Sequence, residues 1–314
     1  MSSLRVDAHV HLYDYGYWPA KWFDFVAAKW SAERPGRQPS EIREKIEAGM
    51  ADPGAVNLLG QMDEVGIDVA VVLALDWEIG MGEPAAVPIE QVHADYEAVA
   101  SSSNGRVVVF AGLDPRRPNA SELMAGLIER GVIRGLKLYP PSGFYPFDER
   151  AAPLLELCQS AELPVVFHTG GTIGLLSPRF ANPLYIQDVQ ANFPALTVWL
   201  AHAGAQWWWE EAVAVAANGI RTYLELSSWQ DVAFHHEERF IAMLDDARRK
   251  LGVERLIFGS DHFSGTRVRG TASLQAWYRW WEELPKRADD CGYSFSEAEV
   301  DAILGGNASA CLGL

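Results

Sequence analysis

The chain has 314 residues, of which 49% are hydrophobic and 22% are charged, and its formal net charge at pH 7 is −16. This length suits two average domains or one eight-stranded α/β barrel, and the hydrophobic share allows a large core. The acidic balance disfavours nucleic acids and anionic membranes as partners.

The cysteines and the N-terminal segment bear on the cellular compartment. The three cysteines, Cys158, Cys291 and Cys311, lie far apart and form no CxxC pair. This pattern argues against a disulfide framework and against a cysteine zinc site. Neither a signal peptide nor a run of 18 apolar residues is visible, so the sequence predicts a cytoplasmic protein. The 12 tryptophans could bury a homodimer interface.

Apolar and β-branched runs predict eight strands, which begin near residues 4, 67, 106, 133, 163, 196, 221 and 254. Helical patterns lie between these strands and at the end of the chain, at residues 41–50, 57–65, 89–101, 121–130, 151–161, 183–192, 206–217, 237–251, 274–290 and 296–304. A β–α unit of about 30 residues repeated eight times is typical of the (β/α)8 TIM barrel. An open, doubly wound sheet is disfavoured because no GxGxxG motif follows a strand.

The longest interval follows the first predicted strand and marks an insertion at residues 13–53. Its aromatic and irregular composition indicates a long loop with one helix. We expect this insertion to lie over the rim formed by the carboxyl ends of the strands, where barrel active sites are found. The sequence therefore predicts an α/β fold with a single barrel domain over residues 1–314.

The first predicted strand contains the motif Asp7-Ala8-His9-Val10-His11. Residues two apart on a strand project from the same face, so His9 and His11 can converge on one point. Two neutral imidazoles at one point suit a divalent metal ion, although a pair of solvated or core histidines is the simpler alternative. Asp7 is expected either to orient a histidine or to form the polar edge of the strand.

Further polar residues stand at the carboxyl ends of other predicted strands. They are Lys137 on the fourth strand, His168 on the fifth, His202 on the sixth, Glu225 on the seventh and Asp261 on the eighth. Four of the eight histidines of the chain therefore fall on one rim of the barrel. A set of purely structural histidines would show no such bias, so the pattern indicates a metal site at this rim.

Six segments, in the order found here, resemble the metal-dependent amidohydrolase superfamily. The resemblance is to the amidohydrolase-2 branch, which includes aminocarboxymuconate-semialdehyde decarboxylase. It extends over nearly the whole chain and rests on Asp7-Ala-His9-Val-His11, Gly135-Leu-Lys137-Leu-Tyr139-Pro140, Val166-Phe-His168-Thr-Gly170, Leu200-Ala-His202-Ala-Gly204, Phe258-Gly-Ser-Asp261-His262 and Ile303-Leu-Gly-Gly-Asn307.

The resemblance implies a ligand set and two catalytic roles. His9, His11, His168 and Asp261 would bind one divalent ion, with zinc favoured and manganese or iron as alternatives. Zinc would lower the pKa of a bound water to about 7. Asp261 would pass the water proton to the leaving group, and His202 would donate a hydrogen bond to the oxygen on which charge develops.

Lys137, Trp229 and His262 are predicted to contact the substrate. Lys137 could instead be carboxylated and bridge a second metal, or pair with Glu225, and His262 could simply cap its loop. Arg267 and Arg269 could clamp a substrate carboxylate, with solvated loop charges as the alternative.

The resemblance implies a hydrolase that uses metal-activated water to cleave an amide, lactone or similar acyl bond of a small-molecule substrate. A non-oxidative decarboxylase of a small unsaturated or aromatic acid is the main alternative, in which the ion polarises the substrate. A related metal-dependent nuclease is disfavoured by Lys137, where that class is expected to carry a glutamate, and by the acidic composition. A barrel that only binds ligand is disfavoured by the complete ligand set.

Overall fold

Parallel strands form at each of the eight apolar runs. The computed structural model describes residues 4–33, 36–265 and 270–314. Its strands are β1 (Val6–His11), β2 (Val69–Leu73), β3 (Val107–Gly112), β4 (Gly135–Leu138), β5 (Val165–His168), β6 (Val198–Ala201), β7 (Thr222–Glu225), β8 (Leu256–Ile257) and β9 (His262–Phe263). Nearly all their residues are buried, because both faces of a parallel sheet are covered. The predicted α/β barrel fold is therefore confirmed.

The last predicted strand is split into β8 and β9, and this split closes the sheet. The strand order is β8-β7-β6-β5-β4-β3-β2-β1-β9, so the two short pieces pair with opposite edges. The chain between them also bonds to β1: the Ala8 N–H donates to the Phe258 carbonyl over 3.1 Å, and the Asp261 N–H donates to the His9 carbonyl over 2.9 Å. The first strand is thus joined to the last along its length.

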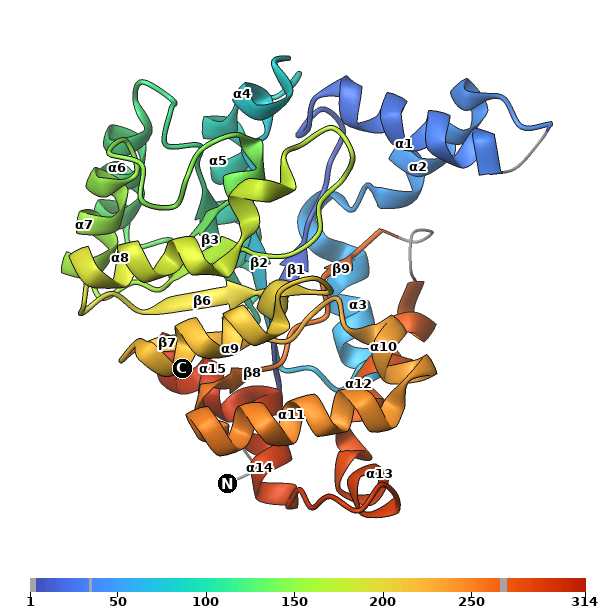
Figure 1. Ribbon diagram of the computed structural model, residues 1–314. Coiled ribbons are helices and arrows are strands. Elements are labelled where there is room, and N and C mark those ends of the chain that lie inside the picture. Colours follow the sequence, from blue (N-terminus) through green and yellow to red (C-terminus); the bar gives the residue numbers. More distant parts are fainter. Residues whose placement is uncertain (1–3, 34–35, 266–269) are drawn as a thin grey trace.

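Helices surround the strands (Figure 1). They are α1 (Ala20–Glu33), α2 (Pro39–Met50), α3 (Val56–Val65), α4 (Glu78–Met81), α5 (Ile89–Ser102), α6 (Ala120–Arg130), α7 (Ala152–Ser160), α8 (Ile186–Asn192), α9 (Trp209–Asn218), α10 (Gln230–His235), α11 (Glu237–Leu251), α12 (Gly270–Glu282), α13 (Leu284–Asp290), α14 (Glu297–Asp301) and α15 (Asn307–Leu312). Within the described ranges, none of these helices has the length and apolarity needed to cross a membrane.

Two apolar clusters make up the core. The smaller one combines alternate strand residues, such as Val69, Val71 and Leu73 of β2, with Ala308 and Leu312 of α15. The larger one packs the opposite strand faces against the surrounding helices. Nine tryptophans belong to the buried core. They therefore supply no argument for a homodimer interface, which stays a prediction.

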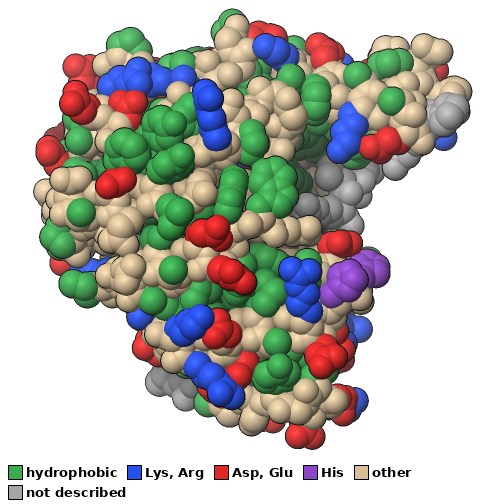
Figure 2. Space-filling model, viewed as in Figure 1, with side chains coloured by type: hydrophobic (Ala, Val, Ile, Leu, Met, Phe, Trp, Pro, Cys, Tyr) green, Lys and Arg blue, Asp and Glu red, His purple; other side chains and the backbone are tan. Residues whose placement is uncertain are grey.

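The insertion at residues 13–53 contains two helices, α1 and α2, where one was expected. These helices pack against each other and project from the body of the molecule (Figures 1 and 2). The missed helix α1 has a weakly amphipathic sequence, AKWFDFVAAKWSAE, in which only Trp22, Phe23 and Ala27 are buried. Aromatic residues scattered around a helix give no clear stripe, so the helical period was hidden.

Candidate metal centre and cavity

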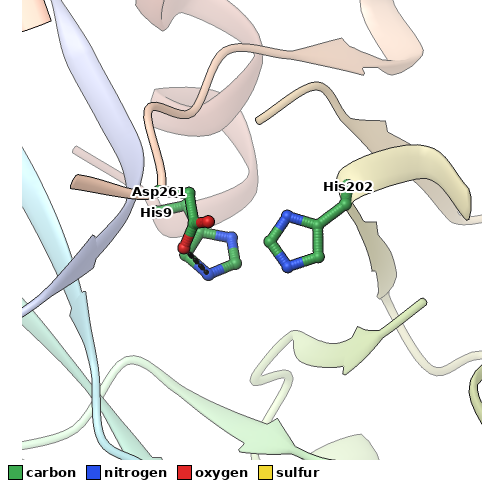
Figure 3. A group of neighbouring side chains, drawn as sticks. All are labelled: His9, His202 and Asp261. Atoms are coloured by element: carbon green, nitrogen blue, oxygen red, sulfur yellow. Dashed lines mark ion pairs between the residues drawn. The ribbon is translucent and has the colours of Figure 1, made fainter. Parts of the chain in front are cut away.

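Three donor atoms, two from β1 and one from the segment between β8 and β9, lie close together. The Nε2 atoms of His9 and His11 are 3.2 Å apart, and Asp261 Oδ1 lies 3.8 Å from the first and 3.4 Å from the second. His9 and Asp261 stand side by side in Figure 3, with His202 across from them. One ligand atom from each of His9, His202 and Asp261 lies within 4.8 Å of the others, so these three residues form a possible metal site.

The histidines of β5 and β6 form the opposite side of this cluster. His168 Nδ1 lies 3.2 Å from His202 Nε2, and the His202 ring lies 4.7 Å from the His9 ring. Burial lowers the pKa of both His168 and His202 well below the usual value, so both imidazoles are neutral. The structure thus brings the four predicted ligands and His202 into one group, in which the histidines are buried and Asp261 is partly exposed.

Each ring has an outer nitrogen, which faces a protein partner, and an inner nitrogen, which faces the cluster. The partner of the outer nitrogen decides whether the inner nitrogen carries a proton or a lone pair. His11 Nδ1 donates to the Leu73 carbonyl over 3.0 Å, and His9 Nδ1 faces Glu225 Oε2 at 2.6 Å. With Glu225 ionised, both outer nitrogens hold the proton, and both Nε2 atoms present lone pairs to each other. Lone pairs 3.2 Å apart cannot bond to each other. A cation between them would satisfy both, so the donor set fits a divalent ion.

The same reasoning applies to the other two histidines. His168 Nε2 donates to the Gly171 carbonyl over 2.8 Å, which leaves a lone pair on Nδ1. The Ser227 hydroxyl donates to Glu225 over 2.9 Å, so His202 Nδ1 donates to Ser227 Oγ over 2.7 Å and His202 Nε2 carries a lone pair. The predicted role of His202 as a hydrogen-bond donor would require Ser227 to donate to His202 instead.

Glu225 is the anchor of this cluster, a role that the sequence did not reveal. Its carboxylate is fully buried and accepts from the backbone N–H groups of Ser227 and His202, at 2.8 and 3.2 Å, besides facing His9. Burial raises the pKa of Glu225, whereas the nearby ammonium group of Lys137 favours the ionised carboxylate. A Cβ on Gly259 would lie 2.0 Å from Glu225 Oε1, so only glycine fits there. A glutamate at the end of a mostly buried strand was the available signal.

Asp7 supports the turn that carries Asp261 instead of orienting a histidine ring. It accepts from the backbone N–H of Ser260 over 2.9 Å, from the Ser260 hydroxyl and from the His9 N–H over 3.2 Å. Burial raises the pKa of Asp7 to about 7. Its contacts join β1 to the segment before β9.

Three residues that line the cavity have left-handed backbone conformations. The φ angles are 64° for His202, 64° for Ser228 and 55° for Asp261. Such angles are unfavourable for residues other than glycine, and they cluster at functional sites. The positive φ of Asp261 also interrupts the eighth strand and turns its carboxylate toward the histidines.

A cavity of about 740 Å³ opens onto the metal cluster. His11, His168, His202 and Asp261 form part of its wall, and five aromatic residues are among the others. The aromatic and cationic lining residues are Trp22 and Lys29 from the insertion, Trp77, Tyr139, Trp207 and Phe263. The insertion therefore contributes directly to the cavity at the carboxyl ends of the strands.

The three residues predicted to contact substrate do not line this cavity. Lys137 is buried, its Nζ has no hydrogen-bond partner among the described residues, and burial lowers its pKa while Glu225 and Asp261 oppose that shift. Trp229 lies behind His202, where its Nε1 donates to the His202 carbonyl over 2.8 Å. His262 Nε2 lies 2.8 Å from Gln61 Oε1. Their roles in substrate binding stay predictions, and Arg267 and Arg269 lie outside the described residues.

The barrel and its strand-end histidines form a possible metal site of a kind found in enzymes, and a comparison with known families specifies the class. Residues 6–314 match the model of the amidohydrolase family, amidohydrolase-2 type, and the chain belongs to this family. The family comprises enzymes of the decarboxylase and hydrolase kinds. No curated protein matches the sequence.

Solved structures with the same fold span nearly the full chain. An uncharacterised TIM-barrel protein from Bordetella bronchiseptica has a TM-score of 0.70 and 21% identity, covering 98% of each chain. A dihydroxybenzoic acid decarboxylase from Polaromonas sp. JS666, with bound manganese and 2-nitroresorcinol, has a TM-score of 0.66 and 16% identity, covering 99% of this chain and 97% of that one. A protein named as a probable 2-pyrone-4,6-dicarboxylic acid hydrolase from Acinetobacter baumannii has a TM-score of 0.62 and 13% identity, covering 99% of both.

Proposed function

We propose that this chain is a metal-dependent hydrolase that cleaves an amide, lactone or similar acyl bond of a small organic substrate. The observation that carries the proposal is the position of Asp261. One carboxylate oxygen lies 3.4 Å from His11 Nε2, and the carboxylate also lines the cavity. A carboxylate shared between a cation site and a substrate cavity is suited to move the proton of an attacking water.

The cation is proposed to lie between His9, His11 and Asp261, with His168 completing the set and His202 beside it. Zinc is favoured, because neutral imidazoles and a carboxylate suit it, and manganese or iron would also fit. When bound, such an ion supplies Lewis acidity and lowers the pKa of water to about 7. The manganese in the dihydroxybenzoic acid decarboxylase supports a divalent ion on this fold.

The protein groups would then share the proton transfer and the positioning. Ser228 Oγ donates to Asp261 Oδ2 over 2.8 Å and holds the carboxylate in place. Asp261 would accept the proton of the attacking water and return it to the leaving group. His202, on the opposite wall, would complete the ligand set through the lone pair on Nε2, or, with Ser227 donating to its Nδ1, donate from Nε2 to the oxygen on which charge develops.

A decarboxylase is the second candidate, and the aromatic wall favours it. Tyr139 stacks on His168 with ring centres 4.2 Å apart, and Trp77 meets Tyr139 at 5.4 Å. Such a wall suits a flat unsaturated acid. The decarboxylase from Polaromonas is named for an aromatic acid, whereas the Acinetobacter protein is named for hydrolysis, so the fold accommodates both reactions.

Isotope labelling separates the two candidates. Metal-loaded protein is incubated with a panel of lactones, aryl amides and aromatic acids, first in ¹⁸O-water and then in D2O. Hydrolysis should place one ¹⁸O atom in the acid product, with no release of CO2. Release of CO2 with deuterium on the former carboxyl-bearing carbon, and no ¹⁸O in the organic product, would establish the decarboxylase instead. Asp261→Asn should abolish either reaction, because an amide cannot relay the proton.

A further inference from the structure

The cavity has an unbroken aromatic wall that runs from the insertion to the metal cluster. Trp22 of α1 stacks on Trp77 at 6.1 Å with an interplanar angle of 15°. Trp77 meets Tyr139 at 5.4 Å, and Tyr139 stacks on His168 at 4.2 Å. All four residues line the cavity. A flat substrate lying along this wall would reach from the metal cluster to helix α1.

Lys29 stands at the α1 end of this wall. Among the described residues that line the cavity it is the one lysine or arginine. It makes no hydrogen bond or ion pair with any described residue. Two of the other polar lining groups already have partners: the Tyr139 hydroxyl lies 3.0 Å from Thr172 Oγ1, and the Ser228 hydroxyl donates to Asp261. Lys29 is therefore a cation at the cavity wall that has no ion-pair partner among the described residues.

Other charged residues of α1 show that Lys29 has no ion-pair partner even where its own helix offers one. Glu33 lies one helical turn further along α1, at the spacing where lysine and glutamate pair on a helix, yet the two side chains form no ion pair. Asp24 of the same helix pairs with Arg43 of α2. Lys21, also on α1, donates to the Met81 carbonyl over 2.8 Å. In a chain with a net charge of −16, a lysine that stays unpaired beside a cavity is available for an anionic ligand.

We infer that Lys29 determines substrate specificity by pairing with an anionic group at the end of a flat substrate that is distal to the reacting bond. The inference rests on the proposed function, since the reacting bond is taken to lie at the metal cluster. The substrate class is a conjugated or aromatic skeleton with a carboxylate, or a similar anion, at its far end. The aromatic wall binds the skeleton, and Lys29 selects for the charge.

The test compares dicarboxylates with their own monoamides, which differ by one charge. The probes are terephthalate and biphenyl-4,4′-dicarboxylate, which give two lengths, and binding to the metal-loaded protein is measured by calorimetry. Lys29→Met should weaken the better-binding diacid about fivefold, the upper range for an exposed ion pair. Its monoamide should change by less than twofold. Lys45→Met, which removes an exposed lysine of α2 outside the cavity lining, should leave both unchanged.

Two further variants make the outcome decisive. Lys29→Arg should retain the preference for the diacid, and Lys29→Glu should reverse it, so that the monoamide binds more tightly. The wild-type preference should also shrink at high salt, because exposed charges are screened. Equal losses for diacid and monoamide in Lys29→Met, or a preference that survives in Lys29→Glu at both lengths, would overturn the inference.

The readout also separates this inference from the proposed function. Monoamides retain the carboxylate that can reach the metal cluster, so their affinity monitors that end of the cavity. If isotope labelling finds no hydrolysis but Lys29→Met weakens the diacid and not its monoamide, the anion site stands and the proposed reaction is wrong. If hydrolysis is found but Lys29→Met affects the diacid and its monoamide equally, only the proposed role of Lys29 is wrong.

Discussion

Replacement of Glu225 by glutamine tests whether the buried carboxylate holds His9 in its metal-binding form. Both oxygens of Glu225 face donors: Oε1 accepts from the Ser227 N–H over 2.8 Å, and Oε2 faces His9 Nδ1 at 2.6 Å. Glutamine has the same shape, but its NH2 group must face one of these donors. The arrangement of lower energy keeps the amide oxygen toward His9 and sets the NH2 group against the Ser227 N–H.

Two effects determine how far Glu225→Gln lowers metal affinity and folding stability. Loss of a carboxylate partner behind a metal-binding histidine typically weakens metal affinity by about 10- to 100-fold, which is about 1.4–2.7 kcal/mol. One buried N–H of Ser227 is left without an acceptor, which costs about 1–3 kcal/mol of folding stability. We therefore expect Glu225→Gln to fold, with a lowered Tm, and to bind zinc or manganese at least tenfold more weakly.

The assay is a competition titration of the purified apoprotein against a chelator of known affinity, with thermal unfolding measured in parallel. Asp52→Asn is the matched control. Asp52 is a buried carboxylate that accepts the backbone N–H groups of Asn57 and Leu58 at 2.8 and 2.9 Å, away from the cavity lining. This control should lose stability and keep its metal affinity. Metal affinity within twofold of wild type in Glu225→Gln would refute the assignment of Glu225 as the partner of His9.

Three other predictions address the ligand set, the space around Glu225 and stability at acid pH. By elemental analysis, His168→Ala should be metal-free, whereas His202→Ala should keep the ion and lose turnover by about 100- to 1000-fold; a metal-free His202→Ala would make His202 a ligand. Gly259→Ala should lower both Tm and metal content, because the new Cβ would lie 2.0 Å from Glu225 Oε1; an unchanged Tm would contradict this. Burial lowers the pKa of His93 to about 4, and its Nε2 accepts the Gly112 N–H. Because unfolded His93 takes up a proton below pH 6.5, its contribution to stability is complete above that pH and falls as pH drops toward 4. The loss at pH 5 is about 2 kcal/mol; urea unfolding should show a smaller loss between pH 7 and 5 for His93→Gln.

Strand positions were predictable because a parallel barrel demands continuous apolar runs. Observed strands begin within about two residues of the predicted positions, and α11 occupies the predicted range, Glu237–Leu251. The eighth strand was expected to be continuous through Asp261, but its backbone turns at that residue, with a φ of 55°. A left-handed conformation at a residue other than glycine leaves no mark in the sequence, because neighbouring contacts impose it.

The candidate site was only partly predictable. Alternation placed His9 and His11 together, and strand ends indicated His168, His202 and Asp261. The partners of these rings were hidden, because Glu225 and Ser227 meet His9 only through the closure of the barrel. Pattern also cannot tell which side of a strand end faces a cavity. Trp229, for example, packs against Trp209 and Phe240 and does not line the cavity, and its contact with substrate stays a prediction.

The closure of the barrel between β1 and the segment Phe258–Asp261 has a consequence for how the fold holds together. His9, His11 and Asp261 stand on both sides of this seam, whose backbone hydrogen bonds join the N-terminal strand to the last one. A cation bound by these side chains would act as a cross-link between chain positions that are remote in sequence. Loss of the cation would then loosen the closed ring of strands first between β1 and Phe258–Asp261. Occupancy of the metal site and resistance of the barrel to local opening would therefore rise and fall together.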